Sequence, residues 1–135
     1  MGRNPNDPNE MIGPAVDGVL AVMKACQEYK VKRVVITSSA AAVSYPARED
    51  ELDEYDETRW SNPDACDFST YIKSKALAEM AAWDFNEKAK KEGKFCPELV
   101  TICPTFIFGE IIGSGDNTST SLIRRIMMGE VPFLV

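Results

Sequence analysis

The sequence predicts an α/β protein in which helices flank a parallel sheet, and three observations indicate this fold class. Segments with helical periodicity alternate along the chain with short apolar runs. The runs are continuous and rich in β-branched residues, which is typical of strands buried on both faces. Small or turn-forming residues follow each run, as expected where a parallel strand ends. The predicted order is helix, strand, helix, strand, helix.

The first helix is expected to begin close to the start of the chain. Asp7 is the predicted N-cap, Pro8 the first helical residue, and Glu10 stands in the capping-box position. Apolar residues then recur at helical spacing as far as about Tyr29. They are Met11, Ile12, Ala15, Val16, Val19, Leu20, Met23 and Cys26.

Two buried strands are expected, at residues 34–37 and 99–103. Ser38 and Ser39 follow the first strand. Pro104 closes the second, which residues 106–109 are predicted to continue after a break.

A long second helix is predicted from about Ser69 to Glu92, because strong helix formers precede Gly93, a fitting stop signal. Its expected apolar stripe consists of Ile72, Leu77, Met80, Ala81 and Phe85.

A short last helix is predicted at 121–129, after a polar loop at 113–119. Residues 44–70 are acidic and show no clear period, which is typical of a functional or disordered segment.

Composition excludes several classes of function. The net charge of −6 argues against nucleic acid and anionic membranes as partners, since both require clustered Lys and Arg. No apolar run approaches the roughly 20 residues of a membrane span. The absence of histidine excludes a Ser-His-Asp centre and a His-based metal site, and we expect no metal. Four cysteines without a Cys-x-x-Cys pair or a secretory signal predict reduced thiols in a cytoplasmic protein.

The candidate site combines Tyr71 and Lys75 with the residues that end the two strands. A spacing of four places both side chains on one face of a helix, where an ammonium would lower the pKa of a phenol. In parallel sheets, ligands bind beyond the carboxyl ends of the strands. Ser38 and Ser39 end one strand and Pro104 the next, so these groups can converge on one crevice. A serine, a tyrosine and a lysine together can polarise a carbonyl and protonate it.

Three segments in this order resemble the extended short-chain dehydrogenase/reductase family: Thr37-Ser38-Ser39-Ala40, Tyr71-x-x-x-Lys75 and Pro104-Thr105. The resemblance is strongest to its dihydroflavonol-reductase-like and cinnamoyl-CoA-reductase-like branch. It extends over about residues 5 to 130 and includes segments 9–12, 22–26, 33–35, 56–60, 73–79 and 81–83.

The resemblance implies reduction of a small-molecule carbonyl, or oxidation of the alcohol, with NADP or NAD as the cofactor. Tyr71 would be the general acid, and Lys75 would lower its pKa and bind the nicotinamide ribose. Ser39 would bind the carbonyl oxygen, with Ser38 as the competing assignment. Pro104 and Thr105 would lie along the nicotinamide, and Thr37 and Ser38 would line its other side through their backbone.

Two departures from the family limit these expectations: the glycine-rich loop is missing, and the family continues beyond residue 135 into a substrate-binding region. No strand followed by a Gly-x-x-Gly-x-x-Gly loop is present, although relatives hold the pyrophosphate there. We therefore expect a partial Rossmann-like domain over residues 1–135, the second half of a dinucleotide-binding domain, with 105–135 starting a substrate-binding lobe. The chain would be a fragment of a reductase. A non-catalytic interaction module and a 3β-hydroxysteroid dehydrogenase or sugar epimerase are the alternatives, and a homodimer is left open.

Overall fold

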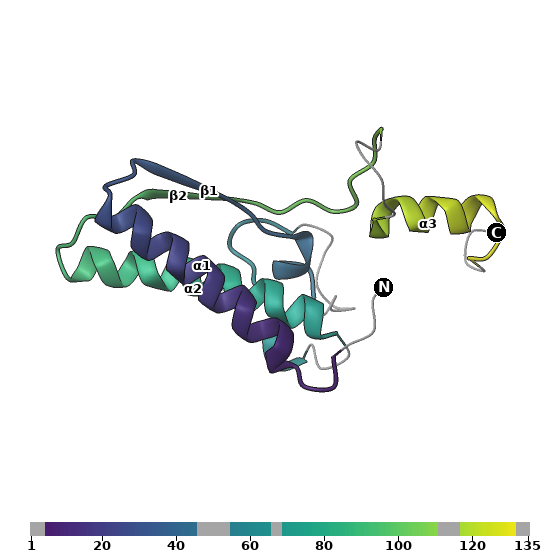
Figure 1. The fold of residues 1–135 in the computed structure, drawn as a ribbon, viewed down its shortest axis with the longest axis horizontal. Coiled ribbons are helices and arrows are strands. Elements are labelled where there is room, and N and C mark those ends of the chain that lie inside the picture. The colour runs from purple at the N-terminus through teal and green to yellow at the C-terminus, as the bar shows by residue number, and fades with distance from the viewer. Residues whose placement is uncertain (1–4, 46–54, 66–68, 111–116, 132–135) are drawn as a thin grey trace. The chain divides into compact units, whose positions relative to one another are not determined.

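The computed structural model describes residues 5–45, 55–65, 69–110 and 117–131 (Figure 1). Predictions for Cys66, for residues 46–54 and 66–68 of the acidic segment and for residues 113–116 fall outside these ranges. The described residues up to Pro104 form one compact unit, and those from Thr105 onward form another. Each unit is described by itself below.

The first helix, α1, spans Asn9–Glu28. It begins one residue later than predicted, because Pro8 is the N-cap and its side chain makes no capping hydrogen bond. Asp7 still acts on the helix start, since its carboxylate accepts a hydrogen bond from the Asn9 N–H at 2.9 Å. The helix ends at the C-cap Tyr29, as predicted.

Strands β1 (Arg33–Thr37) and β2 (Glu98–Ile102) form a parallel pair, with Val34 beside Leu99 and Thr37 beside Ile102. Helix α2 connects them, so the three elements make a β-α-β unit. The prediction of burial on both faces is wrong for this chain. Both helices lie on the same side of the two strands (Figure 1), and the opposite face exposes three apolar side chains: Val35, Val100 and Ile102.

Helix α2 spans Thr70–Lys91, within one residue of the prediction at each end. The Ser69 hydroxyl accepts a hydrogen bond from the Ile72 N–H, and Gly93 follows the helix in the left-handed region at φ 66°. The predicted stripe is only partly correct, because Leu77, Met80, Ala81 and Phe85 are half-buried. The buried positions are mainly small or polar: Thr70, Ile72, Ser74, Ala76, Glu79, Ala82, Asn86 and Ala89. Small side chains let α1 and α2 approach closely, which moves the larger ones to the flanks of the contact.

The core of this unit lies between the two helices and the covered face of the sheet. Met23 of α1, Val34 of β1, Ala82 of α2 and Leu99 of β2 form its buried centre. Burial of a side chain such as that of Met23 stabilises a fold by about 1.5–3 kcal/mol. The same core fixes α2 against the strand ends that carry the candidate site.

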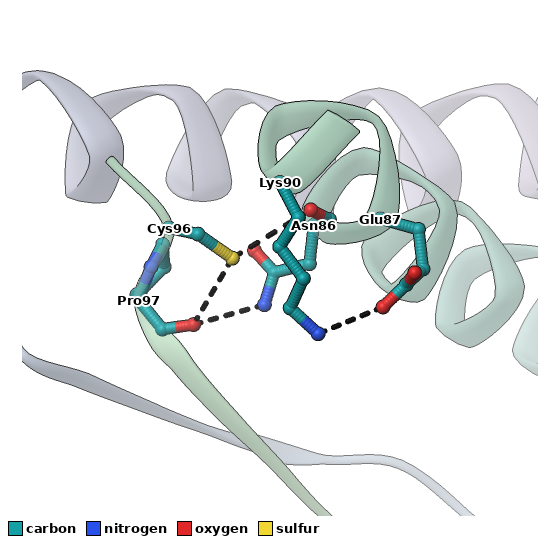
Figure 2. A network of polar contacts seen from close by, with 5 residues as sticks. All are labelled: Asn86, Glu87, Lys90, Cys96 and Pro97. Carbon is teal, nitrogen blue, oxygen red and sulfur yellow. Dashed lines mark hydrogen bonds and ion pairs between the residues drawn. The ribbon is translucent and has the colours of Figure 1, made fainter. Parts of the chain in front are cut away.

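A polar network joins the end of α2 to the amino end of β2 (Figure 2). The Asn86 side chain donates to the Pro97 carbonyl at 2.9 Å. The Cys96 thiol can donate its one hydrogen to either of two carbonyls, that of Asn86 at 3.6 Å or that of Pro97 at 3.7 Å. On the outer surface, Lys90 pairs with Glu87 at 2.7 Å. These contacts hold the turn between α2 and β2 at the end of the sheet opposite to the candidate site.

The C-terminal unit contains α3 (Thr118–Met127), which begins three residues before the prediction. The earlier start follows from a capping box that Asn117 and Thr120 form. Residues 106–109 do not continue β2, contrary to the prediction. Phe106 and Phe108 instead stack on each other, with ring centroids 6.1 Å apart, and the Ile107 N–H donates to Ser119. Within the described ranges, no helix is both long and apolar enough to cross a membrane.

Candidate active site

Tyr71 and Lys75 lie one turn apart in the first two turns of α2, with both side chains on one face of the helix. The ammonium nitrogen of Lys75 stands 5.9 Å from the centroid of the Tyr71 ring, within the range of a cation–π contact. The Tyr71 side chain is 48% exposed, and Lys75 is half-buried. The Tyr71 side chain in this position is therefore accessible from solvent.

The two serines after β1 have different environments. Ser38 is buried, its N–H donates to the Ile102 carbonyl at 2.8 Å, and its hydroxyl donates to the carboxylate of Glu79. Ser39 is half-buried, and its hydroxyl oxygen accepts a hydrogen bond from the Ala41 N–H at 3.2 Å. This bond caps a single 3-10 turn, η1 (Ala40–Ala42). The hydroxyls of the two serines that follow β1 thus have different partners, Glu79 for Ser38 and the start of η1 for Ser39.

Backbone hydrogen bonds hold the ends of both strands together beyond the regular ladder. The Ala40 N–H donates to the Pro104 carbonyl at 2.9 Å, one step after the bond from Ser38 to Ile102. The structure therefore places Pro104 beside the serine segment. Thr105 is exposed and is the first residue of the C-terminal unit.

A cavity of about 210 Å³ opens where α1, α2 and the carboxyl end of β1 meet. It brings together three of the predicted residues, Thr37, Ser38 and Lys75, beside the carboxylate of Glu79. Its other walls are formed by Ala15, Val19, Ile36, Ser74 and Ala78. Ser39, Tyr71 and Pro104 are not part of this lining. The structure therefore assembles Lys75 with the end of the first strand, and places Tyr71 one turn before it on α2.

Sequence reasoning missed the functional potential of Glu79. Its side chain is 5% exposed and accepts hydrogen bonds from Ser38, from the Trp83 indole at 3.4 Å and from the Cys103 thiol at 3.6 Å. The signal was present in the sequence, since Tyr71, Lys75 and Glu79 recur at every fourth residue and so follow one helix face.

The carboxylate also affects the neighbouring thiol. Burial raises the pKa of the Cys103 thiol, and the negative charge of Glu79 and its hydrogen bond with the thiol raise it further. Hydrogen bonds with Ser38 and with the Ser39 backbone act in the opposite direction. Cys103 is therefore a neutral hydrogen-bond donor at neutral pH. Among the described residues, no group of three Cys, Asp or Glu side chains could hold a metal ion.

The β-α-β unit, together with the family match that follows, places the chain in the class of extended short-chain dehydrogenases and reductases. The chain belongs to the 3-beta hydroxysteroid dehydrogenase/isomerase family, whose sequence model matches residues 3–130. The resemblance described from the motifs is thereby confirmed.

Individual relatives come from the reductase branch. The chain is 38% identical over 126 residues to cinnamoyl-CoA reductase 1 of Petunia hybrida. The alignment covers 92% of this chain and 36% of the relative. It is 38% identical over 130 residues to an anthocyanidin reductase of Vitis vinifera, covering 90% of this chain and 36% of the relative. The chain thus spans about a third of the length of these curated relatives.

A solved structure supports the Rossmann-like fold. The yeast methylglyoxal/isovaleraldehyde reductase in complex with NADPH superimposes with a TM-score of 0.77 at 30% identity. The match covers 94% of this chain and 41% of that one. The prediction of a partial α/β sheet flanked by helices is confirmed.

Proposed function

We propose that this chain carries the proton-donating part of an NADPH-dependent carbonyl reductase, as a fragment of a longer enzyme. The observation that carries the proposal is the approach of Lys75 to Tyr71 on α2, next to the hydroxyl-bearing end of β1. The named activities of the relatives support it, since cinnamoyl-CoA, anthocyanidin and dihydroflavonol reductases are among them.

The residues present fit the nicotinamide-ribose half of NADPH. Lys75 supplies a cationic donor and Thr37 a hydroxyl at the rim of the 210 Å³ cavity, and both groups suit ribose oxygens. The sequence holds no glycine-rich loop after a strand, so the residues that hold a pyrophosphate are not among these 135. When bound, NADPH supplies the hydride that attacks the carbonyl carbon.

Tyr71 then donates its phenolic proton to the carbonyl oxygen, which becomes the hydroxyl of the product alcohol. Lys75 stabilises the phenolate that remains until a proton from solvent restores the phenol. Ser39 donates a hydrogen bond to the same carbonyl oxygen and holds it toward Tyr71.

The contacts of the two serines favour Ser39 over Ser38 in this role. A hydroxyl has one hydrogen to donate, and that of Ser38 goes to Glu79. The Ser38 N–H is also used, by the Ile102 carbonyl. The Ser39 oxygen only accepts a bond, from Ala41, so its hydrogen can point at a substrate. For the same reason, a cofactor contact of Ser38 is restricted to its carbonyl. Contacts of Pro104 and Thr105 with the nicotinamide stay predictions.

The test is an assay of the protein expressed from its complete coding sequence against a carbonyl panel. The panel contains an aromatic aldehyde, methylglyoxal, a dihydroflavonol and a cinnamoyl thioester, and the readout is loss of NADPH absorbance. We expect turnover of at least one member and formation of the matching alcohol or aldehyde. The contrary result is no oxidation of NADPH with any of these carbonyls, together with oxidation of a 3β-hydroxysteroid by NAD. The protein would then follow the chemistry for which its family is named.

A second candidate function is a non-catalytic chain, and the absence of the glycine loop favours it. Titration of the 135-residue chain with NADPH, followed by cofactor fluorescence, separates the two. Micromolar binding supports a working cofactor half-site, whereas no binding supports a chain that acts at most as an interaction module.

The cellular location and the assembly stay predictions. The thiols of Cys26, Cys96 and Cys103 form no disulfide, which supports the proposed cytoplasmic location. A homodimer is tested by measuring the mass of the protein in solution.

A further inference from the structure

Glu79 is a buried carboxylate that the proposed reaction does not use. Within the described residues, no salt bridge joins it to a lysine or arginine. A buried charge without an opposite charge is costly unless several donors satisfy it. Here the donors are side chains from three places: Ser38 after β1, Cys103 after β2, and Trp83 one turn further along α2.

These donors make Glu79 the point where both strand ends are attached to α2. The same helix carries Tyr71 two turns earlier and Lys75 one turn earlier. Any shift of the serine segment relative to α2 therefore changes the distance between the Ser39 hydroxyl and Tyr71. Glu79 opposes that shift because it binds the hydroxyl of Ser38, the residue directly before Ser39.

The contact also decides which of two adjacent serines faces the reactants. Ser38 and Ser39 are chemically equivalent, and successive side chains of an extended segment point to opposite sides. With the Ser38 hydroxyl drawn inward to Glu79, the Ser39 hydroxyl is directed away from the core and caps η1. We propose that Glu79 is a positioning residue that holds Ser38 in the core and thereby orients Ser39 toward the carbonyl. This inference rests on the proposed function, because it assigns Ser39 to the substrate oxygen.

The experiment is a mutant cycle in the protein expressed from its complete coding sequence, with the best carbonyl from the panel. The variants are Glu79→Gln, which keeps the size and removes the charge, and Ser38→Ala, which removes only the donor. Each is made alone and in the Ser39→Ala background. Glu87→Gln is the matched control, since it makes the same chemical change at an exposed position of α2.

We expect Glu79→Gln and Ser38→Ala each to lower kcat by about tenfold, because a misplaced catalytic group reduces rate even when binding survives. The Kd for NADPH should stay within about twofold of the parent, as for a change confined to the chemical step. In the Ser39→Ala background, neither change should lower kcat further, because each acts through Ser39. Glu87→Gln should match the parent.

Three results would overturn the inference while leaving the reductase intact: unchanged kcat in both variants, losses that multiply with that of Ser39→Ala, or an equal loss of NADPH affinity. If Glu79→Gln fails to fold in a thermal melt, Ser38→Ala decides alone. An active Ser39→Ala variant would remove the Ser39 assignment together with the role of Glu79. A parent without carbonyl reduction would refute the proposed function itself, and the inference with it.

Discussion

Two of the polar side chains that helix α2 buries, Glu79 and Asn86, lie two turns apart and contact opposite ends of the sheet. Asn86 is 2% exposed and bonds to the Pro97 carbonyl before β2 begins (Figure 2). Glu79 is 5% exposed and takes its hydrogen bonds from side chains that follow β1 and β2. The Asn86 amide thus binds a backbone carbonyl, whereas the Glu79 carboxylate binds side chains next to the candidate site. We propose that the end of the sheet near Asn86, the fold end, mainly maintains the fold, and that the end near Glu79, the site end, shapes the candidate site.

Apart from the removal of the Tyr71 hydroxyl itself, the largest expected effect at the site end is that of Lys75→Met, which keeps the length of the side chain and removes its charge. We expect kcat for carbonyl reduction to fall by about 10²-fold, since general acid catalysis needs the phenolate stabilised. Steady-state kinetics at saturating NADPH measure this, with Lys91→Met at the exposed end of α2 as the control. A kcat within twofold of the parent would separate Lys75 from the chemistry.

The fold end should respond in stability instead. Asn86→Ala removes the amide donor to Pro97 and leaves this buried carbonyl with only the weak thiol donor of Cys96, which costs about 1–3 kcal/mol. Urea denaturation of the variant should show a lower midpoint with an unchanged kcat per folded molecule. Asp84→Ala, an exposed change on the same helix, is the control. A stable variant with impaired kcat would erase the distinction between the two ends.

The Cys103 thiol should make the stability of the site end depend on pH. Because burial and Glu79 raise the pKa of its thiol above 9.0, the neutral thiol is favoured in the folded state. Its contribution to stability is full below the pKa of the unfolded thiol and is lost as pH rises through the higher folded value. Alkylation of native Cys103, followed by mass spectrometry from pH 7 upward, should therefore reach half its maximal rate at a higher pH than in the urea-unfolded chain. An equal or lower midpoint in the native protein would contradict the assigned environment.

The smallest effect belongs to the Glu87–Lys90 pair on the outer surface of Figure 2. Both side chains are more than half exposed, and surface ion pairs contribute little to stability. Lys90→Met should leave the urea midpoint unchanged within error. A clear drop would show that the network at the fold end extends to the surface.

The features of α2 that the sequence predicts well are those that depend on local signals. The bounds of α2 follow from local signals, Ser69 as the cap and Gly93 as the stop. A start at about Ser69 and a stop at Gly93 were predicted. The positions of Tyr71 and Lys75 on one face follow from helix geometry alone. These features depend on residues close together in the sequence.

Features that depend on distant contacts were missed. The buried face of α2 is set by how closely α1 packs on it, so alanines and polar residues are buried where larger apolar residues were expected. The burial of Glu79 depends on Ser38 and Cys103, which lie 41 and 24 residues away in the sequence. The apolar run at 106–109 satisfies a strand pattern, but it has no strand partner in the described part of the chain.

The central claim, that Tyr71 protonates the carbonyl, is tested most directly by comparing Tyr71→Phe with Tyr29→Phe. The two changes remove the same hydroxyl, and Tyr29 is 77% exposed at the end of α1. At saturating NADPH and carbonyl, we predict a loss of kcat of about 10³-fold for Tyr71→Phe, as for a missing general acid, and none for Tyr29→Phe. Equal activity of the two variants would contradict the claim.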